Sequence, residues 1–116
     1  MINGISSGLS ALQAIQKKVD SIADNTANLN TDGFKKTKVT LAEGVQGVVA
    51  HVQRVENQGA LAYEQTGDGQ TLVEKSNVDP GEELPDLMMS RRALQANIKT
   101  IQAQDEMTGH LLDIKS

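Results

Sequence analysis

Apolar residues recur at helical spacing near both ends of this 116-residue chain. In the first stretch they follow steps of three and four residues, which place their side chains on one side of a helix, and they predict a helix over about residues 5–28. These apolar positions are Ile5, Leu9, Leu12, Ile15, Val19 and Ile22. Alanines beside this stripe allow a second helix to approach closely.

A second, longer helix is predicted over about residues 80–113. Asp79 can cap free backbone N–H groups, and Pro80 suits the first helical position. Such a helix is roughly 50 Å long at 1.5 Å per residue, which is too long to be buried in so small a domain, so it needs a partner. Pro85 predicts either a kink or an irregular first turn, followed by unbroken helix from Asp86. The apolar positions are Leu87, Leu94, Ile98, Ile101, Met107, Leu111 and Ile114.

The segment between the two predicted helices contains turn and strand signals. Asn, Asp and Gly crowd into residues 25–33, so the first helix is predicted to end there, with Leu29 and Phe34 folded back onto it. Short stretches rich in apolar and β-branched residues follow, and they predict β-strands. The predicted strands are residues 38–41, 45–55, 61–64 and 71–74, with a turn at 66–70.

These elements predict a mainly α fold with a small β lobe. The long N- and C-terminal helices are expected to pair as an antiparallel coiled coil, because each has an apolar stripe that the other can cover. Asp105 and Thr108 fall where strict heptads require apolar residues, so a mixed period or contacts with more than one neighbour are expected. The predicted divisions are 1–36 (helix and turn), 37–75 (β lobe) and 76–116 (C-terminal helix).

The composition indicates that the hydrophobic core alone is too small to stabilise the chain. Hydrophobic residues make up 38%, Phe34 and Tyr63 are the two aromatic residues, and there is no Trp, so a large core is unexpected. Small cores are usually supplemented by disulfides, metals or oligomerisation. With no cysteine available for a disulfide or a thiolate ligand, oligomerisation is the expected route.

Charge argues against a nucleic-acid partner, because the net charge is −4. Residues 1–40 carry five lysines against three aspartates, whereas residues 41–116 carry six basic and twelve acidic residues. The two ends could therefore attract each other. No run of 18 apolar residues is present, so no membrane span is predicted. The N-terminal stretch lacks a basic region and a continuous apolar region, so no cleavable signal peptide is predicted.

The sequence contains no motif that predicts an enzyme, a cofactor site or a metal site. Asn28-x-Asn30-x-Asp32-Gly33 resembles the start of a calcium loop, but its twelfth position is Val39 instead of Glu, so a helix-ending turn is the preferred interpretation. His51 and His110 have no neighbouring ligands in the sequence. Glu82, Glu83 and Asp86 are interpreted as charges at a helix N-terminus, not as a catalytic pair.

The chain resembles the flagellar axial family, the rod, hook and hook-associated proteins of bacteria, in two motifs. The N-terminal signature of the family is similar to Ser21-Ile22-Ala23-Asp24-Asn25-Thr26-Ala27-Asn28-Leu29-Asn30-Thr31-Asp32-Gly33-Phe34-Lys35. The C-terminal signature is similar to Ser76-Asn77-Val78-Asp79 followed by Arg92-Ala93-Leu94-Gln95-Ala96-Asn97. Leu94 replaces the usual aromatic residue, and Pro85 interrupts a segment that is normally free of Pro. The short region between the signatures is most similar to the short proximal-rod (FlgC-like) type.

This resemblance implies a structural subunit of the basal-body rod, which spans the periplasm. Members are exported through the flagellar type III export apparatus without a cleaved signal, and they polymerise helically with copies of themselves and other rod proteins through their terminal helices. The implied subunit-interface residues are Ile5, Leu9, Leu12, Ile15, Val19, Ile22, Asn25, Asn28, Asn30, Gly33, Phe34, Leu87, Leu94, Gln95, Asn97, Ile98, Ile101 and Leu111.

Two other interpretations stay open at this point. The chain could be a non-rod flagellar paralogue that acts as an adaptor or assembly factor, in which case finished basal bodies would lack it. It could also be a calcium-responsive binding module built on the Asn28–Gly33 segment, in which case calcium would stabilise it.

Overall fold

Two helices and two β-hairpins make up the chain in the computed structural model, which describes the backbone of residues 2–45 and 47–115 and the side chains of 6–45 and 47–114. The molecule is elongated, with extents of 81 × 23 × 19 Å. In chain order the elements are α1 (Ile2–Ala27), β1 (Thr37–Gly44), β2 (Gly47–Arg54), β3 (Leu61–Thr66), β4 (Gly69–Glu74) and α2 (Pro80–Lys115). These bounds agree with the predicted elements to within a few residues.

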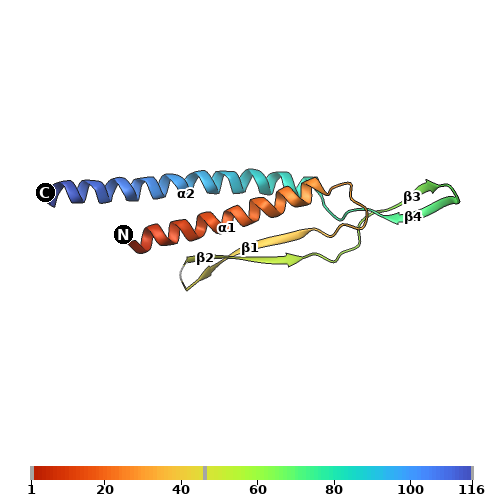
Figure 1. The fold of residues 1–116 in the computed structure, drawn as a ribbon, viewed down its shortest axis with the longest axis horizontal. Coiled ribbons are helices and arrows are strands. Elements are labelled where there is room, and N and C mark those ends of the chain that lie inside the picture. Colours follow the sequence, from red (N-terminus) through yellow and green to blue (C-terminus); the bar gives the residue numbers. More distant parts are fainter. Residues whose placement is uncertain (1, 46, 116) are drawn as a thin grey trace.

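The two helices lie side by side and run in opposite directions, with both chain ends at the same end of the molecule (Figure 1). Since α2 has 36 residues and α1 has 26, α2 continues past the start of α1. Within the described part of the chain, α1 is the one element that packs against α2. The predicted antiparallel orientation of the helices is therefore present.

The side of α2 that faces α1 follows a seven-residue repeat in which polar and apolar residues alternate as far as Gln104. We name these positions the inner seam; they are Glu83, Leu87, Ser90, Leu94, Asn97, Ile101, Gln104 and Thr108, and all are buried or half-buried. Spacings of four and three residues keep such positions on one side of a helix. The inner seam is therefore more polar than apolar, because five of its eight residues are polar.

Asp79 caps the start of α2 as predicted. Its Oδ1 atom accepts a hydrogen bond of 2.9 Å from the N–H of Gly81, and its carbonyl accepts the N–H groups of Glu82 and Glu83. α2 is helical from Pro80, so the predicted irregular first turn before Asp86 is wrong. Pro85 lies inside the helix on its exposed side, where water can satisfy the backbone carbonyl that loses its partner.

The strands form two separate two-stranded antiparallel sheets instead of one lobe. The β1–β2 hairpin packs along α1, where Val39 is buried and Ser10 Oγ donates a 2.7 Å hydrogen bond to the Val48 carbonyl. The β3–β4 hairpin projects from the far end of the molecule and packs on none of the other described elements (Figure 1).

The core is as small as the composition predicts. The buried apolar residues among those described are Ala14, Ile15, Ile22, Val39 and Val78. Ala14, Ile15 and Ile22 lie on α1, Val39 lies on β1, and Val78 lies just before α2. Large apolar side chains elsewhere are exposed, including Met89, Met107 and Ile114. A chain that buries so little apolar surface gains much of its order from polar contacts or from partners.

Candidate functional site

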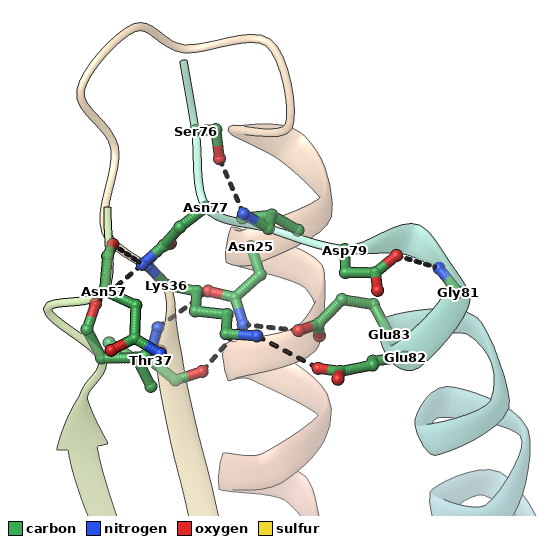
Figure 2. A network of polar contacts seen from close by, with 12 residues as sticks. Asn25, Lys36, Thr37, Asn57, Ser76, Asn77, Asp79, Gly81, Glu82 and Glu83 are labelled. Atoms are coloured by element: carbon green, nitrogen blue, oxygen red, sulfur yellow. Dashed lines mark hydrogen bonds and ion pairs between the residues drawn. The ribbon is translucent and has the colours of Figure 1, made fainter. Parts of the chain in front are cut away.

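The end of α1, the start of α2 and the start of β1 meet at one place (Figure 2). We name this cluster the helix-end joint and define it as Asn25, Lys36, Thr37, Asn77, Glu82 and Glu83. The residues come from three segments, of which the one that contains Asn77, Glu82 and Glu83 is distant in the sequence from the other two, and hydrogen bonds connect them. The joint fixes where each long helix ends relative to the other.

Asn25 lies at the centre of the helix-end joint and is 1% exposed. Its Oδ1 atom accepts the N–H of Thr37 at 3.0 Å, and its Nδ2 atom donates to the Thr37 carbonyl at 2.8 Å and to Glu83 Oε1 at 3.3 Å. An amide supplies both the donor and the acceptor that this position requires, whereas a carboxylate would supply acceptors alone. Asn25 therefore ties α1 to both β1 and α2.

Asn77 likewise connects separate segments of the backbone through its side-chain amide. Its Oδ1 atom accepts the N–H of Lys36 at 2.7 Å, and its Nδ2 atom donates to the carbonyls of Val55 and Asn57, both at 2.9 Å. These three backbone groups belong to the segments that enter β1 and leave β2. Asn77 thus holds the base of the β1–β2 hairpin against the segment that leads into α2.

Glu83 is the one acidic side chain of the joint that is buried, at 7% exposed. Burial raises the pKa of Glu83 above its ordinary value of 4.5, and the carboxylates of Asp86 and Glu82 act in the same direction. The hydrogen bond from Asn25 and the charge of Lys36 lower it in part. Glu83 lies in the first turn of α2, as the sequence indicated, and its side chain also accepts a hydrogen bond from Asn25 of α1.

Ion pairs surround the joint. Lys36 Nζ lies 3.1 Å from Glu82 Oε2, which connects β1 to the first turn of α2. Lys35 pairs with Glu74, and the hydrogen bond from Lys35 holds the pKa of Glu74 below its ordinary value. Lys75 pairs with Glu64 and, at 3.0 Å, with Asp32. These pairs attach the base of the β3–β4 hairpin to the turn that follows α1.

The turn after α1 is made by Asn28 and Gly33. Asn28 Nδ2 donates to the Asp24 carbonyl at 2.8 Å, and its Oδ1 atom accepts the hydroxyl of Thr31 at 3.0 Å. Gly33 has φ of 71°, a left-handed conformation that glycine adopts without strain, and its N–H donates to the Glu74 carbonyl at 2.8 Å. The polar groups of this segment are thus used in a turn.

A cavity of about 600 Å³ opens beside the joint, between α1, β1 and the start of α2. Lysines and carboxylates both line it, among them Lys18, Lys38, Glu82 and Asp86. Over the part of the chain that the structure describes, no group of three or more His, Cys, Asp or Glu residues could hold a metal ion. In the same part of the chain, neither helix is both long and apolar enough to cross a membrane.

Comparison with known proteins assigns both ends of the chain. Residues 5–35 match the family described as flagella basal body rod protein, and residues 70–114 match the one described as flagellar basal body rod FlgEFG protein C-terminal. The first match contains Asn25 of the helix-end joint, and the second contains Asn77, Glu82 and Glu83. The chain belongs to the flagellar rod and hook family.

Three relatives illustrate the match of this rod and hook family member. The flagellar basal-body rod protein FlgG of Bacillus subtilis is 42% identical over 50 residues, which cover 43% of this chain and 19% of that protein. The flagellar hook protein FlgE of Borreliella burgdorferi is 32% identical over 74 residues, which cover 63% of this chain and 17% of that protein. The flagellar basal-body rod protein FlgF of Mesorhizobium japonicum is 49% identical over 39 residues, which cover 34% of this chain and 16% of that protein. The matches span less than a fifth of the length of each relative.

The residues expected at subunit interfaces fall into three groups in this rod and hook family member. Ile15, Ile22 and Asn25 are buried inside the chain. Those that are half-buried are Leu12, Val19, Asn28, Phe34, Leu87, Leu94, Asn97 and Ile101. Those that are exposed are Leu9, Asn30, Gly33, Gln95, Ile98 and Leu111. The side chain of Ile5 lies outside the described residues. The buried group, including Asn25, contacts the chain's own elements, so the exposed group is the one available to neighbours.

Five of the six residues of the joint were not predicted as functional: Lys36, Thr37, Asn77, Glu82 and Glu83. A signal for Glu83 was available, because the spacing of Leu87, Leu94 and Ile101 repeats every seven residues and Glu83 precedes Leu87 by four. Thr37 has no such signal, since its contribution is its backbone N–H and carbonyl.

Proposed function

We propose that this chain is a structural subunit of the bacterial flagellar basal-body rod, which polymerises helically through its terminal helices to build the hollow drive shaft. The observation that carries the proposal is that both family-matched segments meet in the helix-end joint, where Asn25 and Asn77 hold the two helices and the β1–β2 hairpin together. A subunit of a drive shaft needs such a stiff body, and the role requires no catalysis or cofactor.

The assembly would use surface that the chain leaves uncovered. Exposed apolar residues on both helices, such as Leu9, Ile98 and Leu111, gain their burial from neighbouring copies or from other rod proteins. The inner seam supports packing of the helix pair as an antiparallel coiled coil, because its residues repeat every seven positions. We further propose residues 1–36, 37–75 and 76–116 as the functional divisions of the chain.

The proposal places the chain in the basal body, within the rod that spans the periplasm. It would reach this site through the flagellar type III export apparatus without a cleaved signal peptide. The short proximal-rod type stays a prediction within the family, since the relatives named above are FlgG, FlgF and FlgE proteins.

Quantitative mass spectrometry of purified hook–basal bodies tests the proposal. We expect this chain in a reproducible copy number per particle. Its absence, with other rod proteins present, would contradict a rod role and favour the non-rod flagellar paralogue.

Substitution of exposed apolar residues tests the assembly surface. Ile98→Asp and Leu111→Asp should each abolish motility while the purified chain keeps its helical circular dichroism, because both side chains are exposed in the single chain. Gln65→Asp on the exposed part of β3 is the matched control and should leave swimming normal. Normal motility in both helix variants would contradict assembly through these residues.

A further inference from the structure

α2 carries a second seven-residue repeat, which α1 does not cover. We name it the outer seam: Asp86, Met89, Ala93, Ala96, Thr100, Ala103, Met107 and His110. Every one of these positions is exposed. Their spacings alternate between three and four residues, so they lie on one continuous stripe, roughly a third of a turn around α2 from the inner seam at 3.6 residues per turn. α2 therefore has two sides with a seven-residue repeat. The inner seam packs against α1, and the outer seam is exposed.

The middle of the outer seam is small and apolar, and larger apolar side chains flank it. Met89 is 68% exposed and Met107 is 59% exposed, with Ala93, Ala96 and Ala103 between them. The hydroxyl of Thr100 donates to the Ala96 carbonyl at 3.0 Å, so it is already satisfied within the helix. The seam from Met89 to Met107 thus presents no charge and no free hydroxyl to a partner.

From Met89 to Met107, the outer seam has the same order of large and small side chains in both directions. Set antiparallel against its own copy, the seam places Met89 opposite Met107, Ala93 opposite Ala103 and Ala96 opposite Thr100. At each end Asp86 then lies opposite His110 of the second copy. Small residues meet small residues at the centre, where helices packed through alanine approach to about 8 Å, and the methionines close both ends.

Charges beside the outer seam agree with the same arrangement. Arg92 and Glu106 lie on its solvent side, and the antiparallel register places Arg92 of each copy beside Glu106 of the other. Neither residue forms an ion pair among the described residues of the single chain. Lys99 would meet its own copy at the centre, which is a repulsion that the two Arg92–Glu106 pairs must offset.

We infer that free copies of this chain pair through the outer seam of α2, as an antiparallel two-fold dimer with Arg92 opposite Glu106. The inference does not rest on the proposed rod function. A two-fold contact uses the same surface on both copies and closes on itself, so it cannot extend a filament. The dimer therefore forms between copies that are not assembled in a filament. It covers the outer seam of α2 until the two copies separate.

Cysteine cross-linking tests the register directly, because the chain has no cysteine of its own. One copy carrying Ala93→Cys is mixed with a differently tagged copy carrying Ala103→Cys, and the mixture is mildly oxidised. A disulfide needs Cβ atoms about 3.5–4.5 Å apart, so we expect a covalent pair between the two tags and little product from either variant alone. Copies carrying Gln102→Cys, which is exposed on another side of α2, are the control and should give no covalent product. Ala93→Cys linked mainly to itself would indicate a parallel pair and overturn the inference, as would the absence of any product.

Charge reversal tests the same pairing without cysteines. In sedimentation equilibrium, the unmodified chain should reach twice its monomer mass, and Arg92→Glu should raise the dissociation constant roughly tenfold. Adding Glu106→Arg to that variant should restore the dimer, because the opposite charges again face each other. A chain that stays monomeric at all concentrations, or a double variant no tighter than Arg92→Glu alone, would overturn the inference. Circular dichroism of each variant establishes that the helices are intact.

Discussion

Gly8 of α1 lies directly against Ile101 of α2, so that a Cβ atom at Gly8 would stand 2.8 Å from Ile101 Cγ1. One turn of α2 earlier, Asn97 Nδ2 donates a 2.7 Å hydrogen bond to the backbone carbonyl of Gly8. The absence of a side chain at Gly8 thus permits both the close approach of the helices and a hydrogen bond to a carbonyl within α1. This contact holds the helix pair at the end opposite the helix-end joint.

Gly8→Ala should therefore destabilise the chain, although alanine has the higher helix propensity. We expect a loss of about 1–2 kcal/mol in the free energy of unfolding, because the branched Ile101 side chain must move or strain. Gly109→Ala is the matched control, since Gly109 also lies in a helix but has no atom within 4 Å of its Cβ position. That control should gain about 0.5–1 kcal/mol from helix propensity. Urea unfolding measures both; equal gains would contradict the close contact.

Asn25→Asp should be strongly destabilising even though the two side chains have the same shape. The variant loses the donor to the Thr37 carbonyl and places a second carboxylate beside the buried Glu83. We expect a loss of about 2–4 kcal/mol near neutral pH, as for other buried polar groups that lose their partners. Asn30→Asp, an exposed position in the following turn, should change stability by less than about 0.5 kcal/mol. Similar unfolding midpoints for the two variants would refute the central place of Asn25.

Glu83 should make stability depend on pH in a direction opposite to most carboxylates. Because burial raises the pKa of Glu83 in the folded chain, folding binds its proton more tightly, and this contribution to stability is full below the ordinary pKa of 4.5. It is lost as the pH rises through the raised value. Glu83→Gln removes the charge and keeps an acceptor for Asn25, so its stability relative to the unchanged chain should increase as the pH rises. Unfolding measured from about pH 4 to pH 8 tests this.

The control for that series is Glu82→Gln, because Glu82 is exposed and pairs with Lys36 at 3.1 Å. It should show no such gain with rising pH. If Glu83→Gln and Glu82→Gln follow the same curve, the burial of Glu83 does not control the pH dependence.

Gly33→Ala should cost about 1 kcal/mol through backbone strain alone. The φ of Gly33 is +71°, where a Cβ atom is unfavourable, and no atom lies within 4 Å of the Cβ position, so no clash contributes. Gly67→Ala is the matched control, because it too has open space but no positive φ. Thermal unfolding should show a lower midpoint for Gly33→Ala and an unchanged one for Gly67→Ala. A neutral Gly33→Ala would mean that the turn relaxes to another conformation.

The sequence by itself determined the local elements of this protein, because their signals act over a few residues. The Asp79 cap, the spacing of Leu87, Leu94 and Ile101, and the glycine at position 33 each specify a helix start, a helix side or a turn without reference to distant residues. The two end motifs likewise identify the family, since they are short and contiguous.

Only the tertiary structure decided which of these residues face inward. Asn25 and Glu83 are 58 positions apart in the sequence, and their contact exists because the intervening hairpins return the chain to the end of α1. This return of the chain to the end of α1 also buries Asn25, which the sequence had suggested as a contact with neighbouring subunits. It also separates the strands into two hairpins, because strand pairing depends on which backbone edges meet and not on the composition of each strand.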